Sequence, residues 1–292
     1  MRDIIWIIGE KIMIALDSLD QLIDQGVSHF LIDASGVLYT DEGVVLGAKD
    51  AIQKLQALNK SVFLVTNNTS LSPSGIQKYL AAKSIFLPEE DILSSGLGLR
   101  WDKEANSLIY GKRCYVYGWD GSRFYVEYAG GLCVDDIQEA EVVVVLASLD
   151  TDNKEEVSKI VSFLNDNPEA SVICGNPDRY VMGLNGLFPV CGFYAEKINH
   201  RIHQEVHWIG KPHDNFSEGL KRYLKNEREL DLDKKNACFF DDNLENVISL
   251  SAVLSISGAL ITDTGLFSDP SLQFKWEGGL TKCHYCLKKF SL

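Results

Sequence analysis

The sequence predicts an α/β protein built around a parallel sheet, and two observations support this fold class. Short apolar runs of strand length recur at residues 29–33, 61–68 and 236–242, and each ends in polar residues. Amphipathic stretches with helical periodicity separate them, for example at 48–60 and 214–226. Strands that alternate with helices in this way are typical of parallel sheets covered by helices on both faces.

The middle of the chain predicts a second, inserted domain. It contains apolar strand runs of its own and an amphipathic helix at 153–165, which is enough for a small α/β unit. After it the chain returns to the first pattern. We therefore expect a core domain formed by residues 1–93 and 196–292, with an insert at 94–195 and a compositionally distinct tail at 271–292.

The composition excludes one class of partner. The chain has 292 residues with 28 Lys and Arg against 41 Asp and Glu, which gives a net charge of −13 at pH 7. Because nucleic-acid binding needs clustered cations, we expect no nucleic-acid partner. A phosphate-bearing substrate must then be held locally by a metal ion or a lysine. The seven scattered cysteines are typical of reduced thiols, which predicts a cytoplasmic protein.

Both ends of the chain raise the question of a membrane contact. The apolar start at 4–16 is interrupted by Glu10 and Lys11, is too short to span a bilayer, and lacks the cleavage site of a signal peptide. We expect it to add a helix or strand to the core. The tail at 271–292 carries a net charge of +3 with aromatic residues between its lysines. Packing on the core is the favoured interpretation, with a peripheral contact to a membrane surface as the alternative.

Polar side chains follow three of the predicted strands at the point where each strand ends. They are Asp33 after the first run, Thr66, Asn67 and Asn68 after the second, and Asp241 and Asp242 after the third. The carboxyl ends of parallel strands form one ligand crevice, so we expect these groups to meet, together with Lys211 from a Gly-Lys-Pro turn. Acids beside a lysine suit a hard divalent cation and a phosphoryl group.

The order of these motifs resembles that of the haloacid dehalogenase superfamily. The stretch DASGVLY from Asp33 is similar to the first motif, LVTNNTS to the second, GKP to the third and FFDDNLEN to the acidic fourth. The pattern GNPDRYV…GKPHDNF resembles the subclass IIA phosphatases, which carry a C2-type cap between the second and third motifs. The resemblance covers nearly the whole chain and implies a Rossmann-like core with residues 94–195 as an α/β cap.

The resemblance also implies roles for the site residues and a Mg²⁺ cofactor. Asp33 would attack phosphorus and become an aspartyl phosphate, while Lys211 would neutralise charge on the nucleophile and the substrate. The implied metal ligands are Asp33, the backbone carbonyl of Ser35, Asp241 and Asp242, and the implied phosphate-binding groups are Thr66, Asn67, Asn68 and Lys211. General physics agrees, because phosphoryl transfer depends mainly on positioning and charge stabilisation.

Two positions depart from the family pattern. Ser35 occupies the position of the family's general acid, and a hydroxyl is a poor proton donor at neutral pH. A phenolate leaves with much less help than an alkoxide, so we expect a preference for aryl phosphates, with phosphotyrosine on a protein as the biological case. In the fourth motif, Phe240 and Asp241 replace the usual Gly-Asp. Asp241 is therefore the first choice as metal ligand, with Asp242 close behind.

Other functions stay open at this stage. A phosphatase of small metabolites, a non-catalytic scaffold and a phosphotransferase with a long-lived aspartyl phosphate are the alternatives, and the oligomeric state is not predicted. A zinc site at His200, His203 and His207, or at Cys283 and Cys286, is the weaker interpretation of those residues. Asn176 and Asp178 could face the substrate from the insert, although they are equally expected as turn formers.

Overall fold

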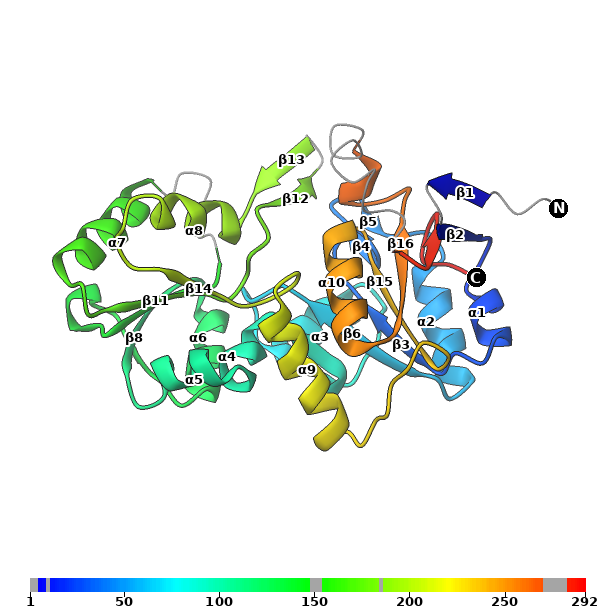
Figure 1. Ribbon diagram of the computed structural model, residues 1–292, viewed down its shortest axis with the longest axis horizontal. Coiled ribbons are helices and arrows are strands. Elements are labelled where there is room, and N and C mark those ends of the chain that lie inside the picture. Colours follow the sequence, from blue (N-terminus) through cyan, green and yellow to red (C-terminus); the bar gives the residue numbers. More distant parts are fainter. Residues whose placement is uncertain (1–4, 9–10, 148–153, 184–185, 270–282) are drawn as a thin grey trace.

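The molecule consists of two lobes, each with its own parallel sheet (Figure 1). This computed structural model describes residues 5–8, 11–147, 154–183, 186–269 and 283–292. The larger lobe holds an eight-stranded sheet and the smaller lobe a five-stranded one. The predicted fold class, α/β with a parallel-sheet core and an inserted α/β cap, is confirmed.

The core sheet places the predicted site strands side by side. Its strands, in spatial order, are β1 (Ile5–Ile8), β2 (Lys11–Leu16), β17 (Tyr285–Leu287), β16 (Ser257–Ile261), β15 (Ala237–Asp241), β3 (His29–Ile32), β6 (Ser61–Thr66) and β7 (Ile92–Ser94). Every pair is parallel except β1–β2. Since β15, β3 and β6 are neighbours, their carboxyl ends meet at one edge of the sheet.

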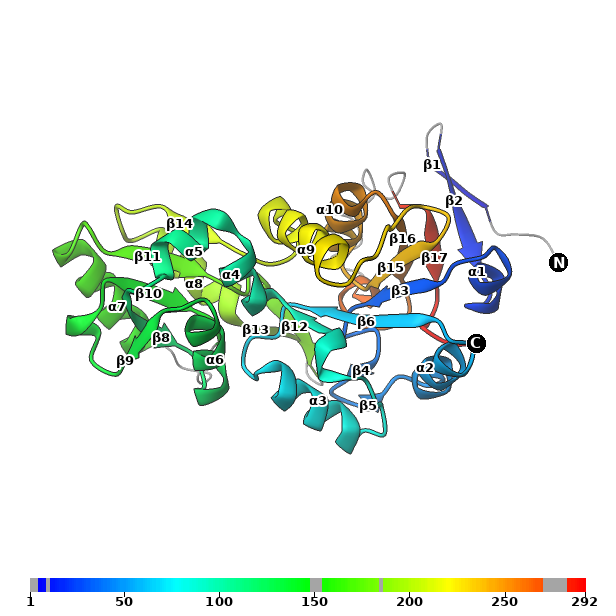
Figure 2. The ribbon, with the colours of Figure 1, turned by 90° about the horizontal axis from the view of Figure 1, so that it is seen from below.

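Helices cover both faces of the core sheet (Figure 2). They are α1 (Asp20–Asp24), α2 (Ala48–Ala57), α3 (Pro73–Ala82), α9 (Asp214–Asn226) and α10 (Leu244–Leu254). Helices α2 and α3 bury their apolar stripes in one core cluster, and α9 and α10 bury theirs in another. The start of α3 follows from its sequence, because the Ser72 hydroxyl accepts a hydrogen bond from the Gly75 N–H at 3.2 Å and Pro73 occupies the first turn.

The cap is a five-stranded sheet with helices packed on it. Its strands, in spatial order, are β14 (Val206–Trp208), β11 (Ser171–Cys174), β10 (Val142–Val145), β8 (Arg113–Tyr117) and β9 (Leu132–Val134). Its helices are α4 (Gly98–Trp101), α5 (Lys103–Ile109), α6 (Asp120–Tyr128), α7 (Lys154–Asp166) and α8 (Cys191–Asn199). Because β14 pairs with β11, the chain leaves this sheet only after Trp208, whereas the predicted cap limit at 195 falls inside α8.

Two hairpins and four short 3₁₀ turns complete the described elements. The hairpins are β4 (Tyr39–Thr40) with β5 (Gly43–Val44) in the core, and β12 (Tyr180–Gly183) with β13 (Gly186–Pro189) in the cap. The turns are Glu89–Asp91, Ser95–Leu97, Ile137–Glu139 and Leu266–Ser268. The β12–β13 hairpin reaches from the cap toward the core, which places it over the carboxyl edge of the core sheet (Figure 1).

The two ends of the chain pack together on the core. Strand β17 lies between β2 and β16, and the Phe290 ring packs edge-on against Phe240 at 5.2 Å between centroids. Packing of the tail on the core is therefore confirmed for residues 283–292, whereas Lys275, Glu277 and Lys282 lie outside the described residues. A membrane contact by the tail stays a prediction. Within the part of the chain that the structure describes, no helix is long and apolar enough to cross a membrane.

Candidate active site

Two acids and a hydroxyl end three adjacent strands at the same edge of the core sheet. Asp33 follows β3 directly and donates its N–H to the Phe240 carbonyl at 2.8 Å, Asp241 closes β15, and Thr66 closes β6. Buried apolar residues fill each strand up to these positions, so the sheet fixes where the polar groups begin. The convergence predicted from the strand ends is present.

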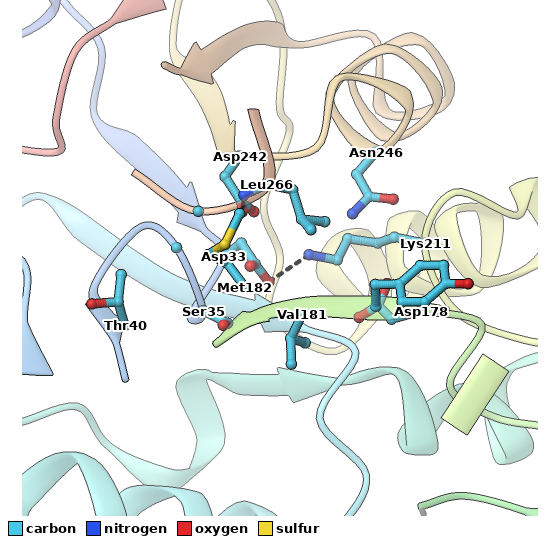
Figure 3. A pocket seen from close by; sticks show the side chains of 13 residues that line it. Asp33, Ser35, Thr40, Asp178, Val181, Met182, Lys211, Asp242, Asn246 and Leu266 are labelled. Carbon is cyan, nitrogen blue, oxygen red and sulfur yellow. Dashed lines mark hydrogen bonds and ion pairs between the residues drawn. The ribbon is translucent and has the colours of Figure 1, made fainter. Parts of the chain in front are cut away.

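Lys211 joins two of these acids through its ammonium group. Its Nζ lies 2.6 Å from Asp33 Oδ1 (Figure 3). It also lies 2.7 Å from Asp241 Oδ2 and donates to the Val65 carbonyl at 2.9 Å. The lysine side chain is 1% exposed. A lysine this deeply buried is satisfied because all its donors have acceptors, and it anchors the nucleophile candidate in one orientation.

Asn67 holds the backbone of Lys211 in place. Its Oδ1 accepts from the Lys211 N–H at 3.0 Å, and its Nδ2 donates to the Lys211 carbonyl and to Asp178 Oδ1, both at 2.8 Å. The Asn67 side chain is thus used within the protein, which leaves its backbone N–H for the predicted phosphate contact. Sequence reasoning missed this clamp, because the two segments are 144 residues apart.

The other two predicted phosphate binders have side chains that brace their own loop. The Thr66 Oγ1 accepts from the Asn68 N–H at 3.2 Å, and the Asn68 Oδ1 accepts from the Ser70 N–H at 3.0 Å. Such side-chain to backbone bonds hold the loop in a turn at the end of β6. Their binding of phosphate stays a prediction.

Asp242 faces the pocket, and Asp241 does not. Both Asp241 oxygens are occupied, by Lys211, by the Asn243 N–H at 2.8 Å and by the Asn246 amide at 3.2 and 3.3 Å. Asp242 instead lines the pocket beside Asp33. Although the sequence favoured Asp241 as first metal ligand, this geometry gives Asp242 the open position and makes Asp241 the partner of Lys211.

Two glycines make room for Asp242. A Cβ at Gly36 would lie 2.3 Å from Asp242 Oδ2, and one at Gly265 would lie 1.9 Å from it. Both glycines have positive φ, at +81° and +67°, which side chains rarely adopt. The N–H of Leu266 then donates to Asp242 Oδ2 at 2.5 Å. The backbone at Gly36 and Gly265 thus packs closely against the Asp242 carboxylate and, with the Leu266 N–H, fixes its orientation.

The donor set fits a hard divalent cation. One oxygen from each of Asp33, Asp241 and Asp242 lies within 4.8 Å of the others, and all three residues are buried. Carboxylate oxygens are the ligands that Mg²⁺ prefers. No second such cluster of acids, histidines or cysteines occurs among the described residues. His207 instead pairs with Asp102 at 3.0 Å, and the Cys283 and Cys286 thiols are buried in an apolar cluster.

The protonation equilibria of these groups reflect crowded negative charge. Burial raises the pKa of Asp33 to about 7 against the opposing effect of Lys211. Burial and the charges of Asp241 and Asp33 raise the pKa of Asp242 well above its usual range. The pKa of Lys211 lies above its ordinary value, because Asp241 and Asp33 outweigh the lowering effect of burial. A bound cation would relieve this repulsion.

Residues from both lobes enclose the pocket, which has a volume of about 30 Å³, little more than a water molecule needs. The lining side chains include Asp33, Ser35, Thr40, Lys211, Asp242 and Asn246 from the core and Asp178, Tyr180, Val181 and Met182 from the cap (Figure 3). The cap residues were not among the predicted site residues, apart from the weak turn signal at Asp178. The hairpin β12–β13 therefore closes the site in this structure.

Comparison with known proteins agrees with this geometry. A sequence model of the haloacid dehalogenase-like hydrolase family matches residues 30–131. The 4-nitrophenylphosphatase of Schizosaccharomyces pombe is 24% identical over 263 residues, which cover 83% of this chain and 86% of that protein. The dihydroxyacetone phosphatase of Corynebacterium glutamicum is 27% identical over 183 residues, or 63% of this chain and 64% of that protein.

Solved structures share the whole two-lobed fold. A possible sugar phosphatase from Cytophaga hutchinsonii superposes with a TM-score of 0.80 at 20% identity, over 95% of this chain and 98% of that one. The 4-nitrophenylphosphatase of Thermotoga maritima gives a TM-score of 0.73 at 21% identity, over 92% and 97%. At these identities the likeness establishes the fold, and the cap is part of it.

Proposed function

We propose, from the premise that this chain belongs to the haloacid dehalogenase superfamily, that it is a Mg²⁺-dependent phosphoric monoester hydrolase with Asp33 as nucleophile. The observation that carries this proposal is the Lys211 ammonium, which contacts Asp33 at 2.6 Å and Asp241 at 2.7 Å beside the open carboxylate of Asp242. The buried ammonium would reduce the repulsion between the Asp33 carboxylate and the anionic phosphoryl group that it attacks.

The reaction would proceed in two displacements. An oxygen of Asp33 attacks phosphorus as the bond to the leaving oxygen breaks, which gives an aspartyl phosphate. Water then attacks that phosphorus, the bond to Asp33 breaks, and inorganic phosphate leaves. Lys211 orients Asp33 and offsets the charge of the phosphoryl group throughout. Mg²⁺, held by Asp33, Asp242 and the Ser35 carbonyl, would supply charge neutralisation at the phosphoryl oxygens.

Ser35 supports a preference for aryl phosphates, including phosphotyrosine. Its hydroxyl lines the pocket at the position where the family carries an acid, but it cannot deliver a proton readily at neutral pH. An aryl phosphate depends less on that proton, because a phenolate is the better leaving group. Two relatives are 4-nitrophenylphosphatases by name, which agrees with this preference.

A phosphatase of small metabolites is the second candidate. Asp178, Tyr180 and Met182 of the cap line the pocket together with the core residues, and a site covered in this way favours a compact substrate over a side chain presented on a protein surface. The relatives named dihydroxyacetone phosphatase and acid sugar phosphatase act on such compounds, as their names state. The non-catalytic alternative is less favoured, because Asp33, Lys211 and Asp242 keep a complete charge arrangement.

Turnover of p-nitrophenyl phosphate and glycerol 2-phosphate, with and without Mg²⁺, tests the proposal. We expect metal-dependent hydrolysis of the aryl substrate that Asp33→Asn abolishes, while Asp24→Asn, an exposed control, leaves it unchanged. Restoring an acid with Ser35→Asp should raise turnover of the alkyl substrate selectively. No metal-dependent activity would favour the scaffold. A phosphoenzyme that discharges only to an added alcohol would favour phosphotransfer.

A further inference from the structure

We propose that Asp178 of the cap protonates the leaving oxygen of poor leaving groups and so replaces in part the acid that position 35 lacks. This inference rests on the proposed function and assigns a residue to its first step. Asp178 lines the same pocket as Asp33 and Lys211, and it reaches that pocket from the opposite lobe (Figure 3). The leaving oxygen departs from the side of phosphorus opposite to Asp33, which is the side the cap covers.

The carboxyl of Asp178 is held in a fixed orientation. Its Oδ1 accepts from Asn67 Nδ2 at 2.8 Å, the same amide group that donates to the Lys211 carbonyl. Asn67 therefore ties the cap acid to the core lysine through a single side chain. A group positioned in this way is available at the reacting centre whenever the cap is closed, which is the condition for efficient proton transfer.

The loop that carries Asp178 has little freedom to move. The Gly192 N–H at the start of α8 donates to the Asp178 carbonyl at 2.8 Å, and a Cβ at Gly192 would lie 2.1 Å from the Pro177 carbonyl oxygen. On the other side, a Cβ at Gly210 would lie 2.6 Å from Pro177 Cδ. The loop is therefore wedged between α8 and the segment that leads to Lys211.

The surroundings of Asp178 favour its protonated form. Burial raises the pKa of Asp178 to about 6, and Asp241 adds to the rise, while Lys211 and the Asn67 amide oppose it. Asp33 also interacts electrostatically with Asp178. With a pKa of about 6, roughly one molecule in ten carries the proton at pH 7, far more than for an ordinary aspartate.

Asp178 gives up a proton in the first displacement and regains one in the second. In the first, Asp33 attacks phosphorus, the bond to the leaving oxygen breaks, and that oxygen takes the proton from Asp178, so an alcohol departs. The resulting Asp178 carboxylate stays bonded to Asn67 and near Lys211. In the second, it accepts a proton from the attacking water, while the phosphorus bond to Asp33 breaks and phosphate leaves. Asp178 is then protonated again, and no other reactant is needed.

The substrate dependence of Asp178→Asn tests this role. We expect turnover of glycerol 2-phosphate to fall by about 10²-fold or more, whereas that of p-nitrophenyl phosphate should fall by less than about threefold in its first displacement, measured as the burst of p-nitrophenolate. Asp166→Asn, an exposed acid of the cap, is the matched control and should leave both unchanged. The ratio of the two turnovers within one variant does not depend on how much of the protein is folded.

The remaining outcomes separate this inference from the proposed function. An equal loss on both substrates would mean that Asp178 only positions Asn67 and Lys211, and would overturn the inference. Adding Ser35→Asp to Asp178→Asn should restore alkyl phosphate turnover, and Asp178→Glu should keep part of it. If Asp33→Asn still hydrolysed p-nitrophenyl phosphate, the proposed function itself would fail, whatever Asp178 did.

Discussion

At the scale of single residues, the acids of the site couple metal binding to pH. Burial raises the pKa of Asp33 from 3.8 to about 7, so the metal-free folded state keeps a proton that the unfolded chain releases. Protonation of Asp33 therefore stabilises the folded state. This stabilisation is fully present below pH 3.8 and is lost as the pH rises through 7. Mg²⁺ binds the ionised carboxylate and competes with this proton, so its affinity should rise as the pH rises.

Mg²⁺ should therefore raise the melting temperature far more at pH 8 than at pH 5.5. A concentration 100-fold above Kd stabilises by about 2.7 kcal/mol at pH 8, and proton competition at Asp33 should cut this to about 1 kcal/mol at pH 5.5. Thermal unfolding with and without Mg²⁺ at the two pH values measures the difference, and Asp242→Asn should remove it. A shift of equal size at both pH values would contradict the role of Asp33 as ligand.

The same residues show what could be predicted from the sequence. Asp33 and Lys211 were predicted because a polar group after a buried strand and a Gly-Lys-Pro turn are local signals. The choice between Asp241 and Asp242 could not be made locally, because neighbouring residues of a strand end point to opposite sides. The role of Asn67 depends on Lys211, 144 residues away, and only the folded chain brings the two together.

At the scale of elements, the turn before Leu266–Ser268 shapes the metal site. Gly265→Ala should displace Asp242, because the new Cβ would lie 1.9 Å from its Oδ2. Altered support of a metal ligand typically costs about 10–100-fold, so we expect that loss in Mg²⁺ affinity and in kcat/KM. Gly111→Ala is the matched control, since Gly111 has a similar φ of +72° and nothing within 4 Å of an added Cβ.

Comparison of Gly265→Ala with Gly111→Ala separates the effect of backbone strain from that of the clash with Asp242. Both should lose about 1 kcal/mol of unfolding free energy, because alanine at positive φ is strained. Only Gly265→Ala should weaken Mg²⁺ binding, measured by calorimetric titration. Equal Mg²⁺ affinity in the two variants would show that Asp242 does not hold the metal.

Elements with strong periodicity were predicted, and short ones were not. The helices that became α2 and α9 and the strands β3, β6 and β15 follow from apolar patterns at least four residues long. Strands β14 and β17 have three residues each, and their identity depends on pairing with β11 and with β2 and β16. The cap limit at residue 195 was misplaced for this reason, because nothing local marks Val206–Trp208 as a cap strand.

At the scale of the whole molecule, the two lobes share one apolar cluster. Leu31 and Phe63 of the core sheet belong to the same buried cluster as Val142 and Ile173 of the cap sheet. Trp101 joins the lobes further by stacking on Phe216 and Tyr223 of α9, at 6.2 and 4.8 Å between ring centroids. A rigid-body swing of the cap would have to break these contacts. We therefore expect substrate to reach the closed pocket by another route.

We expect local opening of the β12–β13 hairpin to provide that route. Its strands pair only with each other among the described elements, and their side chains are half-buried or exposed, whereas all four residues of β10 are buried. Segments with few buried contacts open at the lowest free energy. We therefore expect local opening of the hairpin, with the rest of the cap closed.

Hydrogen exchange measured by mass spectrometry distinguishes the two kinds of opening. In the free protein, amides of Tyr180–Gly183 should exchange at least about 100-fold faster than those of Val142–Val145. Mg²⁺ with inorganic phosphate should slow exchange in the hairpin and leave β10 unchanged, because the ligand fills the pocket that Tyr180 and Met182 line. If β8, β10 and the hairpin gained protection together, the cap would move as one body, and its shared cluster with the core would have to separate each time substrate enters.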